Sequence, residues 1–148
     1  MNICIGIISY LPKQYIIRNN RLSKLDNIPI SMELVWQNAS PTSKFEPQTI
    51  NFTKTSNDIV CVEFLDYTDN SLKKTCMVQN GSGSLESIRQ VVNGGTEPPY
   101  IFQRAFDVSN SGVTFGTCMM KLTNSGTSYP NENRGCVPNK IFIIKGVQ

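Results

Sequence analysis

The sequence has no histidine and a single tryptophan among 148 residues. Histidine is the commonest general base in enzymes, the usual activator of serine and cysteine nucleophiles, and the commonest metal ligand. Without it, catalysis would depend on carboxylates or on an activated Cys, Lys or Tyr. The acidic cluster Asp66-Tyr-Thr-Asp69 lacks the spacing of a calcium loop and is interpreted as a surface turn. We therefore expect a protein that is not an enzyme, with no catalytic residues, no metal site and no cofactor.

Charged residues are also scarce, at 17% of the chain, and the net charge is +3. Arg18, Arg21 and Lys24 come nearest to a basic cluster, but a nucleic-acid footprint gathers more Lys and Arg together with stacking aromatics. The apolar run Ile3 to Leu11 is shorter than the roughly 20 residues that span a bilayer. It also lacks the basic stretch and the cleavage site of a signal peptide. We expect neither nucleic acid nor membrane as a partner.

The five cysteines form no closely spaced pair, and their number is odd. This pattern predicts neither a disulfide framework nor a zinc site. Cys61 lies in an apolar run and is expected to be a small buried residue. The chain is expected to mature in a reducing cytoplasm.

Alanine and glutamate are few, whereas Asn, Ser, Thr and Gly are abundant, which favours short strands joined by turns over helices. Alternating or apolar segments predict strands at 33–36, 48–54, 58–65, 72–79, 84–92, 100–108, 112–120 and 140–144. The segment 84–92 also fits a short helix, although a strand is favoured. We expect an all-β domain over residues 32–148, an antiparallel, jelly-roll-like β-sandwich of seven to nine short strands.

Residues 1–31 form a separate segment, a strand or helix appendage that anchors or oligomerises the chain. Pro12 followed by the charged stretch from Lys13 to Asp26 predicts a helix. Alternating spacings of four and three residues produce a short seam with one polar interruption, made of Leu11, Tyr15, Arg18, Leu22 and Leu25. Two interpretations stay open, a surface helix docked on its own domain and an oligomerising stalk that uses Leu11, Tyr15, Leu22 and Leu25.

Three segments resemble the terminal β domain of phage tail fibre and tail tip proteins of Gram-positive hosts. The first is Leu34-Val-Trp-Gln-Asn-Ala-Ser-Pro-Thr-Ser-Lys-Phe-Glu-Pro-Gln-Thr-Ile50. The second is Ser111-Gly-Val-Thr-Phe-Gly-Thr-Cys118, and the third is Val137-Pro-Asn-Lys-Ile-Phe-Ile-Ile-Lys-Gly146. The resemblance extends over residues 32–146. Its motifs are structural, and it supplies no catalytic residue.

The resemblance implies a virion structural protein, a tail fibre, tail tip or head fibre component that is assembled in the host cytoplasm. Its expected partners are two further copies of the chain in a trimer, other virion proteins and a host cell-surface glycan. Two long polar loops, Asn93 to Pro99 and Leu122 to Gly135, are the expected contact surface because loops at one end of a rigid sandwich commonly carry binding.

Four residues in or beside these loops are the predicted ligand-binding candidates, namely Tyr100, Tyr129, Asn131 and Arg134. Aromatic faces stack on sugars, and the Arg fork binds anionic groups. Trp36 ends an apolar strand and is assigned to the core instead. Two alternatives stay open, a carbohydrate-binding module of a larger assembly and, less favoured, a glycan-active enzyme.

Overall fold

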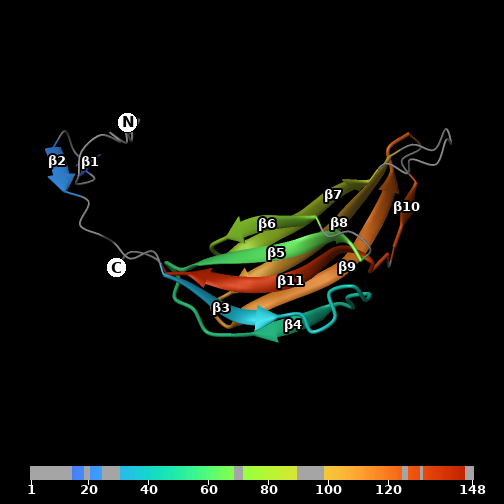
Figure 1. Ribbon diagram of the computed structural model, residues 1–148, viewed down its shortest axis with the longest axis horizontal. Coiled ribbons are helices and arrows are strands. Elements are labelled where there is room, and N and C mark those ends of the chain that lie inside the picture. The colour runs from blue at the N-terminus through green and yellow to red at the C-terminus, as the bar shows by residue number, and fades with distance from the viewer. Residues whose placement is uncertain are drawn as a thin grey trace. The chain divides into compact units, whose positions relative to one another are not determined.

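The computed structural model describes residues 15–18, 21–24, 31–68, 72–89, 99–124, 127–130 and 132–145, the first two ranges by their backbone alone. The chain divides into two compact units, residues 1–30 and residues 31–146. Every regular element of the described residues is a β-strand (Figure 1). The all-β prediction is confirmed, and the strand favoured over residues 84–92 is confirmed as far as Arg89, the last residue of that segment that the structure describes.

The first unit contains an antiparallel hairpin of β1 (Tyr15–Arg18) and β2 (Arg21–Lys24), with Ile17 opposite Leu22. The helix expected from Lys13 to Asp26 is therefore wrong. The β-branched pair Ile16-Ile17 favours a strand. Leu11 and Leu25 lie outside the described residues. The role of the predicted seam in oligomerisation stays a prediction, although its helical basis is lost.

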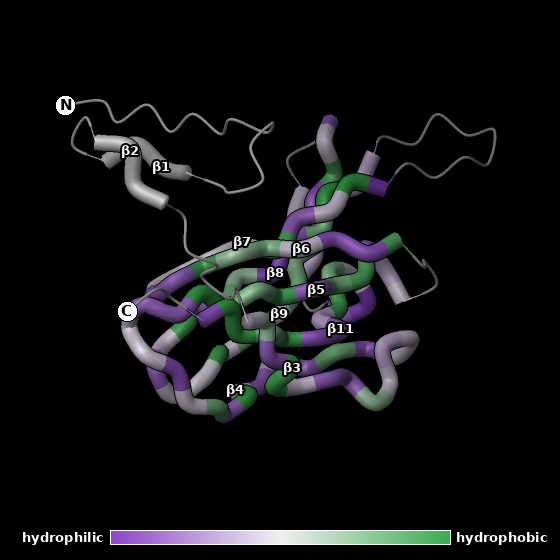
Figure 2. Tube along the Cα trace, turned by 60° about the vertical axis from the view of Figure 1, so that its left-hand side comes forward, coloured by the Kyte–Doolittle hydropathy of each residue, from purple (hydrophilic) through white to green (hydrophobic). Residues whose placement is uncertain are grey.

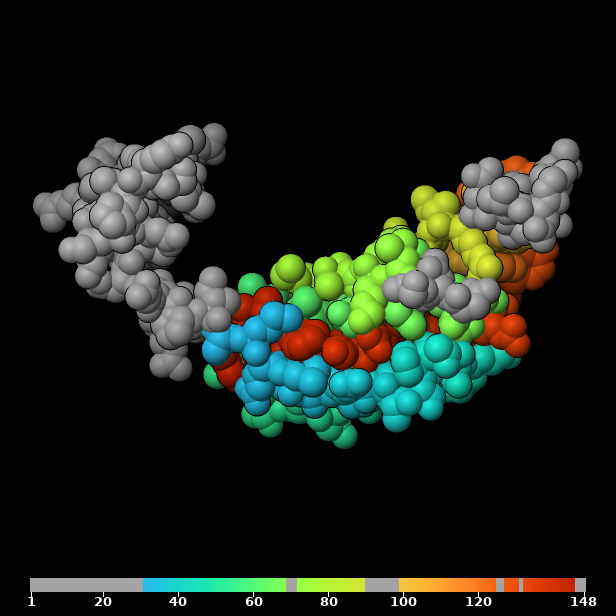
Figure 3. All heavy atoms as spheres, in the orientation of Figure 1, coloured from blue at the N-terminus to red at the C-terminus, as the bar shows by residue number. Residues whose placement is uncertain are grey.

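Residues 31–145 form a sandwich of two antiparallel sheets. The order of the first sheet is β3-β11-β5-β6, made of β3 (Met32–Gln37), β11 (Gly135–Ile144), β5 (Ile59–Tyr67) and β6 (Lys73–Val78). The order of the second sheet is β10-β9-β8-β7, and β4 also pairs with β9. The strands of this sheet are β4 (Gln48–Asn51), β7 (Gly81–Arg89), β8 (Tyr100–Ser109), β9 (Gly112–Leu122) and β10 (Ser128–Tyr129). In Figure 3 the side chains of β3, β11 and β5 lie side by side along the first sheet.

The core lies between the two sheets and follows from the alternation of side chains along each strand. On β8 every second residue from Phe102 to Val108 is buried, and Ile141 and Ile143 of β11 face the same interior. The alternation of hydrophobic and hydrophilic residues can be followed along the trace in Figure 2. Trp36 packs edge-on against Phe45, with ring centroids 6.0 Å apart, and Cys61 is buried, as the sequence predicts.

Three boundaries differ from expectation. The last strand begins at Gly135 instead of 140, although Pro138 cannot donate to a ladder. The sheet accommodates this proline because β3 pairs with β11 only from Lys140 onward, and the Asn38 side chain donates to the Pro138 carbonyl at 2.9 Å. β7 begins at Gly81, three residues before the predicted strand at 84–92. Asp66, expected in a surface turn, is a buried residue of β5.

Candidate functional site

The two ends of the β domain differ in what they carry. At one end, Ser31 accepts a hydrogen bond from the backbone of Lys145, so the chain enters and leaves the described domain side by side. At the other end, β5 and β7 finish, β8 and β11 begin, and β9 finishes (Figure 1). We call this second end the loop end, because the connections between those strands gather there.

Three of the four predicted binding residues lie at the loop end. Tyr129 of β10 is 44% exposed, and Arg134 is exposed next to the start of β11. Tyr100 begins β8 but is half-buried and packs against the core, so its ring contributes to stability more than to the surface. Asn131 and residues 93–98 lie outside the described residues. The structure thus brings Tyr129 and Arg134 to the same end of the β domain.

Tyr67 and Arg89 join the two sheets at the loop end. The Arg89 guanidinium lies 4.5 Å from the centre of the Tyr67 ring, and that ring packs against Phe102 with centroids 5.3 Å apart. The carbonyl of Arg134 accepts a hydrogen bond from the backbone of Thr68 at 3.0 Å. These contacts hold the ends of β5, β7 and the segment before β11 together.

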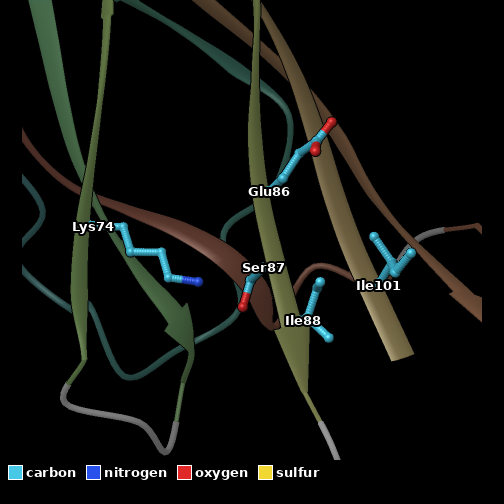
Figure 4. A pocket seen from close by; sticks show the side chains of 5 residues that line it. All are labelled: Lys74, Glu86, Ser87, Ile88 and Ile101. Atoms are coloured by element: carbon cyan, nitrogen blue, oxygen red, sulfur yellow. The ribbon is translucent and has the colours of Figure 1, made fainter. Parts of the chain in front are cut away.

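A pocket of about 270 Å³ lies beside β7 near this end and is lined by Lys74, Glu86, Ser87, Ile88 and Ile101 (Figure 4). Lys74 of β6 extends toward Ser87, and its Nζ lies 2.9 Å from Oδ1 of the buried Asp66. The Ser87 hydroxyl is buried and has no hydrogen-bond partner among the described residues. Ile88 and Ile101 present apolar surface on the other side of β7.

The pocket combines hydrogen-bond donors, hydrogen-bond acceptors and apolar surface. Lys74 is held by its ion pair with Asp66 and offers hydrogen-bond donors. Glu86 adds carboxylate acceptors at the surface, and the two isoleucines can contact C–H groups. A neutral ligand with many hydroxyls would match such a mixture of donors, acceptors and apolar surface.

Arg104 donates hydrogen bonds to backbone carbonyls on both sides of the segment that contains Tyr129 and Arg134. Its side chain is fully buried, and it donates to the carbonyls of Cys136 at 3.0 Å and Gly116 at 2.6 Å. It also reaches the carbonyls of Asn133 and Gly135 at 3.4 and 3.5 Å. Burial lowers the pKa of this guanidinium from its usual value. The sequence places Arg104 among apolar residues on one face of a strand. It does not show that Arg104 donates hydrogen bonds to the carbonyls of Asn133, Gly135 and Cys136.

Residues that the sequence did not single out include Tyr67, Lys74, Ser87 and Arg89. Tyr67 lies in the predicted turn after the strand at 58–65 and Arg89 lies near the end of the predicted strand at 84–92, but neither position carries a local signal of function. Their significance arises from contacts between the sheets, which one strand pattern cannot show.

No family model, curated protein or solved structure matches this chain. Among residues 15–18, 21–24 and the described parts of 31–145, no group of three or more potential metal ligands occurs. Within those same ranges, no helix has the length and apolar character required to cross a membrane.

Proposed function

We propose that this protein is a phage virion structural protein, a fibre or tail-tip component whose loop end contacts the host cell surface. The observation that carries the proposal is that the two ends of the β domain differ. The chain enters and leaves at the end marked by Ser31 and Lys145, whereas Tyr129 and Arg134 lie at the opposite end. An attachment domain needs this arrangement, since one end must join the particle and the other must reach the receptor.

The resemblance of residues 32–146 to terminal domains of tail fibre and tail tip proteins supports the same function. In this proposal residues 1–30 join the domain to the virion or to two further copies in a trimer. The cell-surface partner is a glycan, because an exposed tyrosine and an exposed arginine provide stacking surface and a planar donor fork.

The pocket beside β7 favours a second candidate, a carbohydrate-binding module of a larger assembly. Its ion pair, its unpartnered Ser87 hydroxyl and its two isoleucines resemble the mixed polar and apolar lining of ligand sites. A module would bind isolated glycans as a monomer, whereas a fibre needs several copies for useful avidity.

The test measures binding of the purified chain to Gram-positive cells and to isolated cell-wall polysaccharides. We expect Tyr129→Ala and Arg134→Ala each to weaken binding roughly tenfold, as loss of a central interface side chain does. Met77→Ala is the matched control, since Met77 is exposed near the opposite end and lies in the first sheet. We expect this variant to bind as the parent does.

Three outcomes contradict parts of the proposal. Failure of the parent chain to bind any cell or polysaccharide contradicts attachment. If Met77→Ala weakens binding as much as the two loop-end variants do, the loop end is not the specific contact surface. Immunogold labelling of phage particles addresses the virion role separately, because label on fibres or tail tips is expected and unlabelled particles contradict it.

A further inference from the structure

The outer face of the first sheet is apolar where an outer face is normally polar. Along β11 the interior side chains Ile141 and Ile143 alternate with Phe142 and Ile144, so this part of the strand is hydrophobic on both faces. An antiparallel sheet that covers a core on one side and faces water on the other usually alternates apolar with polar residues. The pattern of β11 is instead typical of a strand that is covered on both sides.

Two rows of apolar side chains cross this outer face from strand to strand. The strand registers place Met32, Ile144 and Ile59 in the first row and Leu34, Phe142, Cys61 and Met77 in the second. The exposed fractions of Met32, Leu34 and Met77 are 53%, 48% and 61%. Figure 3 looks onto the first sheet, with β3, β11 and β5 side by side. We call the two rows the outer apolar face.

The outer face of the second sheet carries a polar row in the same direction. This row consists of Thr49, Thr114, Asp107 and Ser82. The hydroxyls of Thr49 and Thr114 lie 2.9 Å apart, and the Ser82 hydroxyl donates to Asp107 at 2.5 Å. The polar row is suited to contact with water, whereas the outer apolar face is suited to contact with another apolar surface.

Two opposite charges border the outer apolar face on the side away from Ser31. Lys140 of β11 and Glu63 of β5 are neighbours in register. Glu63 accepts a hydrogen bond from Asn139, and the Nζ of Lys73 lies 3.8 Å from its Oε1. Lys140 is half-buried and has no ion-pair partner among the described residues. A positive and a negative group therefore stand side by side at the same level of the sheet.

We propose that the outer apolar face is a contact surface between two copies of this chain, related by a two-fold axis that runs along the strands between β11 and β5. This axis sets β11 of each copy against β5 of the other, so Phe142 faces Cys61 and Ile144 faces Ile59. The same operation sets Lys140 against Glu63 twice in each pair of copies. Charge complementarity therefore favours a second copy as the occupant.

The axis also agrees with the two ends of the domain. Because it runs along the strands, it keeps Ser31 and Lys145 of both copies at one end and both loop ends at the other. The face of a four-stranded sheet with a central strand of about ten residues covers roughly 600 Å². A standard interface buries about 800 Å² on each partner. The contact is therefore weak and forms where copies are held close together.

The experiment cross-links copies of the full chain carrying Cys4→Ser with a short bis-maleimide. Leu34→Cys and Met77→Cys are combined in one chain, because the two-fold axis sets Leu34 of each copy against Met77 of the other. Within one chain these positions are three strand spacings apart, about 14 Å, which the linker does not span. Both positions lie at the margins of the face, where truncation of a side chain costs little binding energy.

The matched control combines Thr49→Cys and Ser82→Cys, which are also three strand spacings apart, on the second sheet. We expect roughly tenfold more covalent dimer from the Leu34→Cys/Met77→Cys chain than from this control on denaturing gels. The chain that carries Cys4→Ser alone measures the background from the remaining cysteines.

Charge reversal tests the proposed register. Lys140→Glu and Glu63→Lys are each added to the Leu34→Cys/Met77→Cys chain, where either change sets like charges against each other across the two-fold axis. We expect each variant alone to lose most of the covalent dimer. An equimolar mixture of the two variants should restore it, as dimers that contain one chain of each kind by mass spectrometry.

Equal yields of covalent dimer from the two cysteine pairs overturn the proposal. So does a mixture of the charge variants that yields no more dimer than either variant alone. If a charge variant does not fold, the comparison of the two cysteine pairs still decides the question. The inference does not rest on the proposed function, because cross-linking is measured without a receptor, a particle or a trimer.

Discussion

Arg104 is the residue on which the geometry of the loop end depends most. A fully buried guanidinium is stable only where its donors find acceptors, and here the acceptors are backbone carbonyls of Gly116, of Asn133 and of the first two residues of β11. The ring of Phe45 lies 5.3 Å from the guanidinium and adds a favourable contact with its face. One side chain thus ties β8, β9 and β11 together from the inside.

Replacement of Arg104 by methionine should destabilise the domain strongly. Methionine keeps much of the buried volume but leaves several carbonyls without a donor, so we expect a loss of roughly 3 kcal/mol or more in the free energy of unfolding. Arg104→Lys should also lose stability, because an ammonium cannot reproduce the planar fork. Urea unfolding measures both. Lys44→Met is the exposed control, expected within about 0.5 kcal/mol of the parent, and an equally small change at Arg104 would contradict this role.

At the scale of elements, the local sequence pattern determines where a strand lies, whereas pairing with the adjacent strand determines where it begins and ends. β5, β8 and β9 lie where alternating or apolar residues predict them. β11 extends five residues toward the N-terminus of its predicted start because β5 continues to pair with it as far as Gly135. The hairpin β1–β2 replaces an expected helix, since the predicted seam covers barely two heptads whereas the β-branched pair Ile16-Ile17 favours a strand.

Gly112 illustrates a glycine that the sheet requires. It pairs with both Asn51 of β4 and Ser109 of β8, its φ is 152°, and an added Cβ would collide with the carbonyl of Ile50. Gly112→Ala should therefore cost about 2 kcal/mol or more.

Gly116 on the same strand is the matched control. A Cβ there would meet the carbonyl of Ala105 at an ordinary 3.5 Å. Gly116→Ala should lose little and can gain up to roughly 1 kcal/mol by restricting the unfolded chain. Thermal and urea unfolding compare the two variants, and equal stability of both would contradict the steric argument.

For the whole molecule, the two compact units suggest that the β domain folds without residues 1–30. Its sheets and core lie within residues 31–145, and Ser31 is fixed by its hydrogen bond with Lys145. A separate N-terminal unit fits an element that joins copies of the chain or joins the chain to the particle.

If the chain forms the proposed trimer through its first unit, removal of residues 1–30 should yield a monomer and leave the unfolding midpoint of the β domain unchanged. Light scattering measures the mass of both proteins, and urea unfolding measures the midpoint. A full-length monomer would contradict a trimer assembled by this segment and favour an anchor to another virion protein or a lone binding module. A lower midpoint in the shortened chain would show that the first unit stabilises the second.

The candidate site was only partly predictable. Tyr129 and Arg134 could be chosen from sequence because they lie in a long polar segment between strands, where binding residues are common. Tyr100 was placed in the same group, yet its position at the start of β8 buries half of it against the core. The Lys74–Asp66 ion pair could not be predicted, because the two residues occupy different strands whose register depends on the whole first sheet.

The sequence by itself determined that the domain is all-β and where most of its strands run, because alternation of polar and apolar side chains is a local property of each segment. Only the tertiary structure decided which strands pair, which end gathers the loops, and that Cys118, Cys136 and Arg104 meet inside the sandwich. Those facts depend on contacts between residues far apart in the chain. The sequence does not link Arg104 to these two cysteines, but the fold places all three residues in one buried, hydrogen-bonded cluster.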